Sequence, residues 1–412
     1  MPEAPHALEA PHPAPGLPAA SPEARPGPGA DGSPPGVPAP AAQPDAERRA
    51  RFGRAAIIVP FHNAEATLAE CLESLARCAE LGAELHVVDD TSTDRSVEVA
   101  RGFPAARLHR RERRGSSGGA RNTAAVLTGR PLLVFVDADV VAAPEQVDRL
   151  LQRLASGEWD AVVGCYGEDH DHRGLISQYK NLWIRRTYVR SPRQPRWFWT
   201  AFCGVQREAF ARVGGFNECY HDARGGVDFE FGWRLTEAGG RILLDTSLTC
   251  RHLKRFTLGS LLRNDRVRAR GYVIQALTLR RRSALGPNRF ANVRLSYFVG
   301  GVTAWLTVLA ALALAAGAAF PAGAAAGALA PMAGVAAPLG AGALAVWLAC
   351  QLRFLAYFSR RRGPIAAVRI LPVLFLDQMA SFAGVAAGVV AYFAGERAPS
   401  GPGFGPGIPG SV

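Results

Sequence analysis

The stretch Val88-Asp89-Asp90-Thr91-Ser92-Thr93-Asp94 decides the predicted fold, together with Asp137-Ala138-Asp139, which begins 43 residues further along the chain. Each acidic group directly follows an apolar run, residues 84–88 or 131–136, of the length typical of a buried parallel strand. Ligands of such sheets bind at the carboxyl ends of the strands, so both groups are predicted to face one crevice. Bare carboxylates are costly there unless a cation or hydrogen-bond donors accompany them. The pattern predicts a divalent metal ion that holds a diphosphate; two solvated acidic turns are the alternative.

A glycine-rich segment lies between these two groups. Gly115-Ser116-Ser117-Gly118-Gly119 leads into a predicted helix that opens with Arg121. The backbone N–H groups of a helix N-terminus bind anions, and a guanidinium adds a fork that suits phosphate. No G-K-[S/T] follows, which excludes a nucleotide-hydrolysing phosphate loop.

Five further segments accompany the two acidic groups in order. They are Ala55-Ala56-Ile57-Ile58-Val59-Pro60-Phe61-His62-Asn63-Ala64-Glu65, Gly118-Gly119-Ala120-Arg121-Asn122, Gly204-Val205-Gln206-Arg207, Gly214-Gly215-Phe216-Asn217-Glu218, and Val227-Asp228-Phe229-Glu230 with Arg234, Leu235 and Gly239. In this order and spacing, residues 54–279 resemble the family 2 glycosyltransferases. The resemblance implies a GT-A fold: an α/β domain with a doubly wound mixed sheet, Rossmann-like, that binds a nucleotide sugar and transfers the sugar with inversion.

The resemblance assigns most of the site to the nucleotide-sugar donor. Asp90 would accept a hydrogen bond from the nucleobase, and the loop at residues 60–63 would cover the base. His62 stands where many relatives have an aromatic residue, and its imidazole can still stack. The predicted donor-binding residues are Pro60, His62, Asn63, Asp89, Asp90, Arg121 and Asp137.

The metal and the catalytic base are predicted at three positions. Asp139 is the expected direct ligand of Mg²⁺ or Mn²⁺, which prefer hard oxygen ligands. The resemblance implies that His252 reaches the metal or the diphosphate, although a structural role fits a lone histidine equally well. Asp228 occupies the position of the family's base, with Val227 in place of the usual Glu. His170-Asp171-His172 is left without a role.

Three residues are predicted to contact the acceptor. They are Trp199, Gly204 and Glu230, of which Glu230 has an ion pair with Arg234 at helical spacing as its alternative. Trp199 closes a basic and aromatic stretch, residues 183–199, that suits an acceptor-binding or membrane-surface element as well as a solvated loop.

Composition divides the 412-residue chain, whose net charge is +12, into several parts. Residues 1–51 hold 14 of the 30 prolines and are predicted to be disordered. Residues 52–282 form the predicted catalytic domain, and residues 397–412 a disordered tail. Seven cysteines without a C-x-x-C pair argue against a disulfide framework or a zinc site.

A transmembrane region is predicted at residues 283–396. Residues 295–352 contain no Asp, Glu, Lys, Arg or His, which fits two spans of about 20 residues each. The predicted spans are about 297–320, 339–358 and 370–394, with residues 321–338 as a connection. Asp377 inside the third span is expected to be functional or to be neutralised by Arg369 or Arg353.

Basic residues predict the orientation of the spans. Arg280-Arg281-Arg282 precede the first span and Arg360-Arg361-Arg362 follow the second, which places both clusters and the catalytic domain in the cytoplasm. A multi-pass protein of the cell inner (plasma) membrane is expected. Residues 253–282, rich in Lys and Arg among apolar residues, are expected to lie on the membrane surface.

The sequence thus predicts a membrane-bound inverting glycosyltransferase that uses a nucleotide-sugar donor and a lipid-linked or membrane-associated hydroxyl acceptor, with no nucleic-acid partner. A polyprenyl-phosphate glycosyltransferase is one alternative, and a non-catalytic membrane protein with a degenerate sugar-nucleotide domain is another. A nucleotidylyltransferase lacks support because Pro60-Phe61-His62-Asn63 replaces its glycine-rich loop. A polymerising synthase is disfavoured because no Q-x-x-R-W segment lies between Asp228 and Tyr297.

Overall fold

The computed structural model describes residues 45–220, 226–279, 285–286, 289–290, 293–319 and 324–399. The predicted disordered extension up to residue 44 and the predicted tail from residue 400 onward lie outside these residues. The extension had been predicted to reach residue 51, and that boundary is wrong. Residues 45–51 belong to helix α1 (Asp45–Phe52), in which Phe52 is fully buried and Arg51 donates two hydrogen bonds to Asp148, at 2.9 and 3.2 Å.

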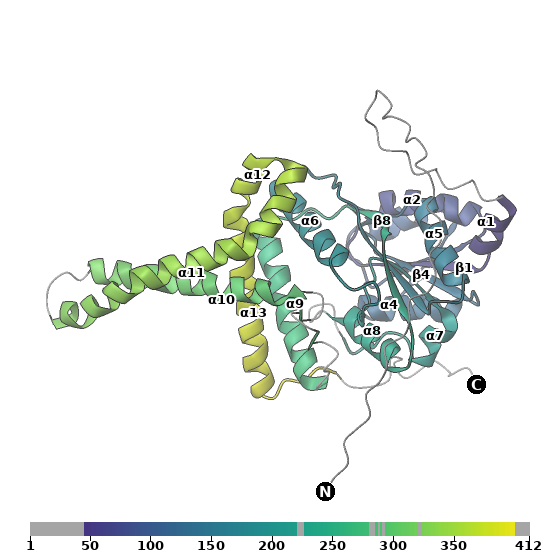
Figure 1. The fold of residues 1–412 in the computed structure, drawn as a ribbon. Helices are drawn as coiled ribbons and strands as arrows, with labels where there is room; N and C mark the ends of the chain where they lie inside the picture. Colours follow the sequence, from purple (N-terminus) through teal and green to yellow (C-terminus); the bar gives the residue numbers. More distant parts are fainter. Residues whose placement is uncertain are drawn as a thin grey trace, which may run out of the picture. The chain divides into compact units, whose positions relative to one another are not determined.

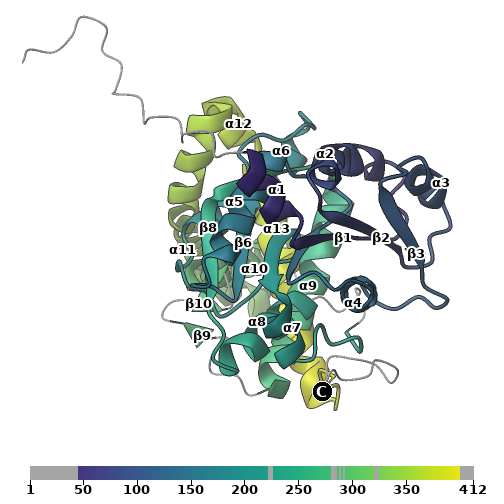
Figure 2. The same ribbon diagram turned by 90° about the vertical axis from the view of Figure 1, so that its right-hand side faces the viewer.

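An eight-stranded sheet forms the centre of the predicted catalytic domain (Figures 1 and 2). Its order is β3-β2-β1-β4-β7-β6-β8-β5. Strand β1 is parallel to β2 and β4, whereas β7 is antiparallel to both of its neighbours, β4 and β6. The strands are β1 (Ala55–Phe61), β2 (Glu84–Asp89), β3 (Ala106–Arg110), β4 (Leu132–Val136), β5 (Val140–Val141), β6 (Ala161–Tyr166), β7 (Phe202–Gln206) and β8 (Ile242–His252). The predicted α/β fold with a mixed GT-A sheet is confirmed.

Helices cover both faces of this sheet (Figure 1). On one face lie α1, α2 (Leu68–Glu80) and α5 (Pro144–Ala155); on the other lie α4 (Ser117–Leu127), α7 (Arg207–Arg212) and α8 (Val227–Glu237). Because both faces are covered, β1, β4 and β6 are buried along their whole length, as their apolar runs predict. Helix α5 shows the complementary pattern: its large aliphatic residues recur at helical spacing and are buried, namely Val147, Leu150, Leu151 and Leu154.

The carboxyl ends of β1, β2 and β4 meet at one edge of the sheet. Phe61 pairs with Asp89, and the N–H of Asp90 donates to the carbonyl oxygen of Phe61 at 2.9 Å. Beyond these ends the chain turns through Asn63 (φ 51°) and Thr91 (φ 64°), both in the left-handed region that non-glycine residues seldom adopt. Such strained turns are concentrated at functional sites.

Two helices connect the sheet to the carboxyl-terminal part of the described chain. Helix α6 (Leu175–Val189) follows β6, and α9 (Leu258–Leu279) follows β8. Helix α9 packs along α13 (Leu371–Phe393), where Gly384 and Gly388 lie against the backbone oxygens of Arg266 and Arg270. Small residues four positions apart permit this close approach of two helices. The α9 part of residues 253–282 therefore packs along another helix.

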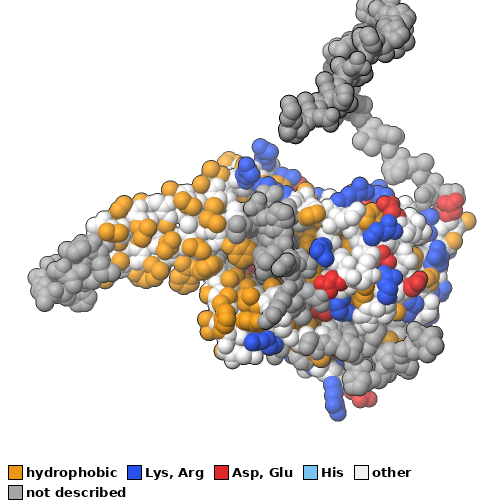
Figure 3. Space-filling model, turned by 60° about the horizontal axis from the view of Figure 1, so that its bottom comes forward, with side chains coloured by type: hydrophobic (Ala, Val, Ile, Leu, Met, Phe, Trp, Pro, Cys, Tyr) orange, Lys and Arg blue, Asp and Glu red, His pale blue; other side chains and the backbone are white. Residues whose placement is uncertain are grey.

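Within the part of the chain that the structure describes, three helices are long and apolar enough to cross a membrane, at Ser296–Ala319, Gly334–Arg362 and Pro364–Phe393. They correspond to α10 (Leu295–Ala319), α11 (Ala324–Arg362), and α12 (Pro364–Arg369) joined to α13. Hydrophobic side chains gather over these helices, whereas charged ones are concentrated on the α/β domain (Figure 3). Leu312 and Leu352 are 60% and 62% exposed, which suits lipid contact and not water.

The predicted connection at residues 321–338 is mostly wrong, because α11 already begins at Ala324. Glycine and proline, which indicate loops in soluble proteins, are tolerated in apolar helices that pack against other helices. The remaining described elements are three two-residue strands, β9 (Leu285–Gly286), β10 (Arg289–Phe290) and β11 (Val293–Arg294), and the short helix α3 (Ser96–Arg101).

Asp377 does not have the partners that the sequence suggested. Its carboxylate accepts hydrogen bonds from the phenols of Tyr179 on α6 and Tyr297 on α10, at 2.6 and 3.0 Å. Neither Arg369 nor Arg353 binds it. The buried carboxylate therefore ties a membrane-type helix to a helix of the α/β domain.

Candidate active site

A cavity of about 700 Å³ opens at the carboxyl ends of β1, β2 and β4. Most of the predicted donor and catalytic residues line it: Pro60, His62, Asn63, Asp90, Arg121, Asp137, Asp139, Trp199, Asp228 and His252. The same cavity continues along α9 to α10 and α13, where Phe298, Phe382 and Val385 form part of its wall. The sequence thus predicted one end of this cavity, and the other end is formed by the apolar helices.

Arg121 and Asp137 face each other at the diphosphate end. Ser116 caps α4 by accepting a hydrogen bond from the N–H of Gly119 at 3.1 Å, and this fixes the helix start that carries Arg121. One guanidinium nitrogen of Arg121 donates to Asp137, while its Nε and its other terminal nitrogen are buried without a protein partner. Burial raises the pKa of Asp137 above its ordinary value, although the charge of Arg121 opposes this. Two unsatisfied guanidinium donors in a buried position fit an anionic ligand such as a phosphate.

Asp139 and His252 form the second pair. The antiparallel register of β5 and β8 places Val140 opposite His252, and the N–H of Leu253 donates to the carbonyl oxygen of Asp139 at 2.8 Å. This register brings the His252 Nε2 to 3.6 Å from the Asp139 Oδ2. Burial alone would raise the pKa of Asp139, but the hydrogen bond and charge of His252 hold it below its ordinary value.

Asp139 and His252 fit a divalent metal whose coordination shell the protein would fill only in part. No group of three or more His, Cys, Asp or Glu side chains that could hold a metal exists among the described residues. Asp139 and His252 could supply an oxygen and a nitrogen, and substrate phosphates and water would have to complete the coordination shell. Mg²⁺ and Mn²⁺ are commonly bound in this way, with few protein ligands plus phosphate.

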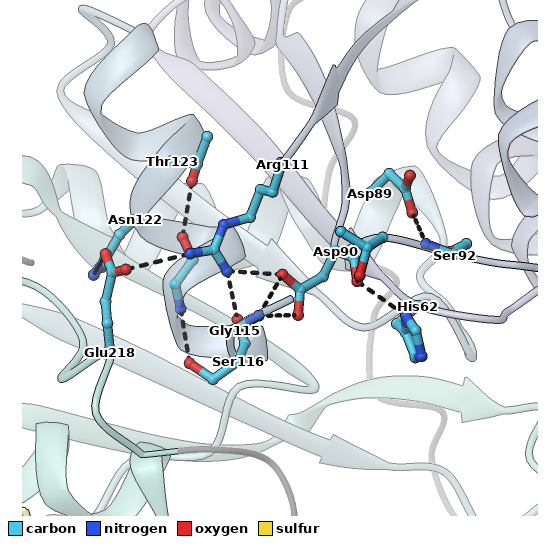
Figure 4. Close-up of polar contacts among 12 residues, drawn as sticks. His62, Asp89, Asp90, Ser92, Arg111, Gly115, Ser116, Asn122, Thr123 and Glu218 are labelled. Carbon is cyan, nitrogen blue, oxygen red and sulfur yellow. Dashed lines mark hydrogen bonds and ion pairs between the residues drawn. The ribbon is translucent and has the colours of Figure 1, made fainter. Parts of the chain in front are cut away.

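Asp90 already has protein partners in the structure (Figure 4). Its carboxylate accepts hydrogen bonds from the guanidinium of Arg111 at 2.8 Å and from the N–H of Gly115 at 3.1 Å. Arg111 also contacts Glu218 at 3.3 Å, and Glu218 accepts from the Asn122 amide at 3.0 Å. Arg111 thus orients the carboxylate that the sequence assigns to the nucleobase. Sequence reasoning missed it, although the parallel pairing of β2 with β3 brings the residue after β3 beside the end of β2.

His62 and Asn63 hold the loop over this end of the cavity. The His62 Nδ1 lies 3.0 Å from the carbonyl oxygen of Asp90, and the Asn63 side-chain oxygen accepts from the N–H of Thr93 at 2.8 Å. Both residues therefore link the loop after β1 to the loop after β2, and their positions agree with a role next to the nucleobase.

Asp228 lies in the first turn of α8, next to the cavity. Its carboxylate is 8% exposed and accepts a hydrogen bond from the N–H of Phe229 at 3.0 Å. The helix begins after Gly226 (φ 88°), where a Cβ would collide with Gln275 on α9. Burial raises the pKa of Asp228 above its ordinary value. A carboxylate with few partners and a raised pKa is suited to accepting a proton.

Three predicted site residues do not line the cavity. Asp89 is fully buried and accepts from the N–H of Ser92 and from Arg110, so it shapes the turn. Gly204 packs against leucines of α5, where a Cβ would not fit. Glu230 binds Arg234, which also donates to the carbonyl oxygen of Gly215. In the structure Gly204 packs against α5, and Glu230 forms the ion pair that is the alternative to its predicted acceptor role.

Contacts between the α/β domain and the apolar helices were also missed. Lys180 on α6 forms a buried ion pair with Asp265 on α9, and both line the cavity. At the end of α11, Arg361 binds the carboxylate of Glu168 at 2.6 Å and Arg362 donates to Glu168's backbone oxygen at 2.7 Å. The residues of these pairs are 85 to 194 positions apart in sequence, so no local sequence pattern predicts the contacts.

Residues 56–218 match the family model for glycosyl transferase family 2. The chain carries a family 2 glycosyltransferase domain. The match covers the strand ends, the Asp90 and Asp137–Asp139 positions and Arg121, whereas Asp228, His252 and α9 lie beyond it.

Related proteins resemble this domain over part of their length. Validoxylamine A glucosyltransferase from Streptomyces hygroscopicus subsp. limoneus is 30% identical over 217 residues, which are 44% of this chain and 48% of that protein. Undecaprenyl-phosphate 4-deoxy-4-formamido-L-arabinose transferase from Pseudomonas aeruginosa is 35% identical over 148 residues, 32% of this chain and 41% of that protein. The chain therefore spans about half or less of the length of these relatives.

The chain is also similar to solved structures, each below 25% in sequence identity. A mannosyltransferase from Pyrobaculum calidifontis, in complex with GDP-Man and Mn²⁺, has 19% identity and a TM-score of 0.47, with 83% of this chain and 88% of that one covered. Glucosyl-3-phosphoglycerate synthase from Mycobacterium tuberculosis, with Mn²⁺ and UDP, has 23% identity and a TM-score of 0.42, with 55% and 82% covered.

Proposed function

We propose that this chain transfers a sugar, with inversion, from a nucleoside-diphosphate sugar to a hydroxyl group of a lipid-linked or membrane-associated acceptor. The observation that carries the proposal is the single cavity that joins Asp137, Asp139 and Asp228 to Phe298 and Phe382 of the apolar helices. One end suits a charged donor and the other end suits an apolar acceptor.

The donor would bind at the charged end. Arg121 directs two buried, unsatisfied nitrogens towards an anion, so it would bind the diphosphate. His62 and Asn63 would lie over the base, and Arg111 would hold Asp90 in position to accept its N–H. Asp139 and His252 would hold a Mg²⁺ or Mn²⁺ ion, which supplies charge neutralisation for the departing diphosphate.

Asp228 would act as the base. Its carboxylate would take the proton of the acceptor hydroxyl as the acceptor oxygen attacks the anomeric carbon from the face opposite the diphosphate. Burial keeps water away from this carboxylate and reserves it for the acceptor. Trp199, which packs edge-on against Tyr166 at 4.6 Å between ring centroids, would form part of the wall next to the sugar.

The membrane part would place the acceptor. We propose that α10, α11 and α13 span the inner membrane, with the glycosyltransferase domain in the cytoplasm. The contacts of Arg361 and Arg362 with Glu168 support this orientation, because they put the basic end of α11 on the same side as the domain. Basic residues prefer that side of the membrane.

A second candidate differs in the nucleophile. A polyprenyl phosphate would attack through an oxygen that is already ionised near neutral pH, since the second pKa of a phosphate is about 6. The similarity to the undecaprenyl-phosphate transferase favours this candidate. In that case Asp228 would not act as a base, and its removal would leave the acid limb of the rate profile in place.

The function is tested by transfer of label from a panel of nucleotide sugars. The purified full chain, in detergent with Mn²⁺, is given each donor with a bacterial lipid extract, and the label in the organic phase is counted. The proposal expects label from at least one donor, in a product that is stable to mild acid, as a glycoside is. An acid-labile product would instead support the sugar phosphate of the second candidate, and no metal-dependent donor use at all would refute both.

A further inference from the structure

Arg268 on α9 lines the cavity, together with residues of the sheet edge and of α10 and α13. A single stripe of α9 lines the cavity, with Asp265, Arg268, Ala269 and Tyr272 at helical spacing. Arg268 donates to the phenol oxygen of Tyr272 at 2.8 Å, and among the described residues no carboxylate forms an ion pair with it. Its neighbours on α9 differ: Arg266 is exposed, and Arg270 binds Glu396.

Most other buried charges of the cavity wall have an ion-pair partner, whereas Asp228 forms no ion pair within the described part of the chain and interacts with the charge of Arg268 from beyond ion-pair distance. Arg121 pairs with Asp137, and Lys180 pairs with Asp265. Asp139 lies next to His252, a proposed metal ligand. Arg268 therefore lines this part of the wall without an ion pair among the described residues, and a guanidinium partly withdrawn from water favours an anionic ligand there.

The position of Arg268 indicates which anion it binds. The diphosphate of the donor is already assigned to Arg121 and to the metal. On α9 and on helices that suit a membrane, the wall includes the apolar side chains of Ala269, Phe298, Phe382 and Val385, beside the polar groups of Tyr297, Gln378 and Ser381. A ligand that fills this half of the cavity needs an anionic group followed by a hydrocarbon chain.

We propose that Arg268 binds a phosphate group of the lipid acceptor, and that the adjoining apolar wall holds the first part of its hydrocarbon chain. The inference rests on the proposed function, and it names the acceptor class as a lipid phosphate. The phosphate can stand beside a hydroxyl nucleophile, as in a phosphodiester lipid with a polyol head group, or be the nucleophile itself, as in a polyprenyl monophosphate. Arg268 recognises the same group in both.

The test compares lipids that differ by the phosphate alone. The full chain in detergent is titrated with a polyprenyl monophosphate and with the polyprenol of the same length, and binding is followed by tryptophan fluorescence. We expect the phosphate to bind about 10-fold to 100-fold more tightly, the range of a charge-assisted hydrogen bond in a partly dry site. Arg268→Gln should remove most of this preference, and Arg268→Lys should retain part of it.

Arg266→Gln is the matched control, because Arg266 lies on the same helix, is exposed and does not line the cavity. Equal binding of phosphate and alcohol by the unaltered chain, or equal effects of Arg268→Gln and Arg266→Gln, would overturn the inference. Metal-dependent binding of nucleotide sugars, measured on the same samples, separates the two proposals: its absence from every sample contradicts the proposed function.

Sugar transfer then distinguishes the two lipid phosphates. The unaltered chain is offered phosphatidylglycerol or a polyprenyl monophosphate together with the donor. Transfer to the first supports a phosphate beside a hydroxyl nucleophile, and transfer to the second alone supports the phosphate as nucleophile. Transfer with equal efficiency to the polyprenol, which has no phosphate, would contradict the role of Arg268.

Discussion

The replacement Asp228→Asn separates catalysis from folding in this chain. The change keeps the size of the side chain and removes its charge, and the backbone N–H of Phe229 retains an oxygen to which it can donate. If the carboxylate accepts the acceptor proton, its loss should lower kcat by about 10²-fold to 10⁴-fold. This corresponds to about 3–5 kcal/mol of transition-state stabilisation.

The same replacement should not destabilise the fold. Burial raises the pKa of Asp228 in the folded chain, so folding favours its protonated form. The stability linked to that form is present at low pH and is lost as the pH rises through the raised pKa. At neutral pH the ionised carboxylate therefore lowers stability, and asparagine does not. We expect a Tm equal to or above that of the unaltered chain.

The assay follows sugar transfer and thermal unfolding from pH 5 to 9. In a plot of kcat against pH, the acid limb should have an apparent pKa above the ordinary aspartate value of about 3.9. This limb should disappear in Asp228→Asn. Asp245→Asn serves as the control, because Asp245 pairs with Arg153 away from the cavity. A variant that retains more than a tenth of the activity, or keeps the same acid limb, would refute the base assignment.

Three further outcomes follow from the contacts in the structure. Asp139→Asn should abolish Mn²⁺ binding in the presence of nucleoside diphosphate, measured by electron paramagnetic resonance, and lower turnover by about 10-fold to 100-fold; unchanged Mn²⁺ affinity would contradict the ligand role. Arg362→Gln should lower transfer to a membrane acceptor more than Arg360→Gln does, with donor affinity unchanged, because Arg362 holds the Glu168 segment and Arg360 is exposed. Glu230→Gln should reduce the free energy of unfolding by about 3 kcal/mol, because it leaves the Arg234 guanidinium without its buried ionic partner. The loss should be measured as a lower Tm, and an unchanged Tm would show that the ion pair is dispensable.

The sheet and the donor end of the cavity could be predicted because their signals are local. Apolar runs of strand length end directly in the acidic turns, and the parallel order of β1, β2 and β4 brings those turns together. The same logic located Asp90, Asp137 and Asp139 at one edge. Three helices of membrane type were also predictable, since long apolar runs with few charged residues can be recognised from composition alone.

The remaining features depend on packing between distant segments. Arg111 acquires its role from the register of β2 and β3, and Arg268 from the way α9 crosses the cavity. On sequence alone, Arg268 is one arginine among many in a basic segment. The start of α11 at Ala324 was missed because alanine, glycine and proline indicate a connection unless other helices support them.

The central claim is that one cavity joins a nucleotide-sugar site to a lipid-acceptor site. The measurement that tests it most directly is the transfer of a radiolabelled sugar from nucleotide sugar to lipid by the full chain, with and without Val385→Trp, which would fill the apolar end of the cavity. The account predicts that this variant binds the donor with Mn²⁺ normally and loses transfer to lipid. Normal transfer to lipid in the blocked variant would contradict the account.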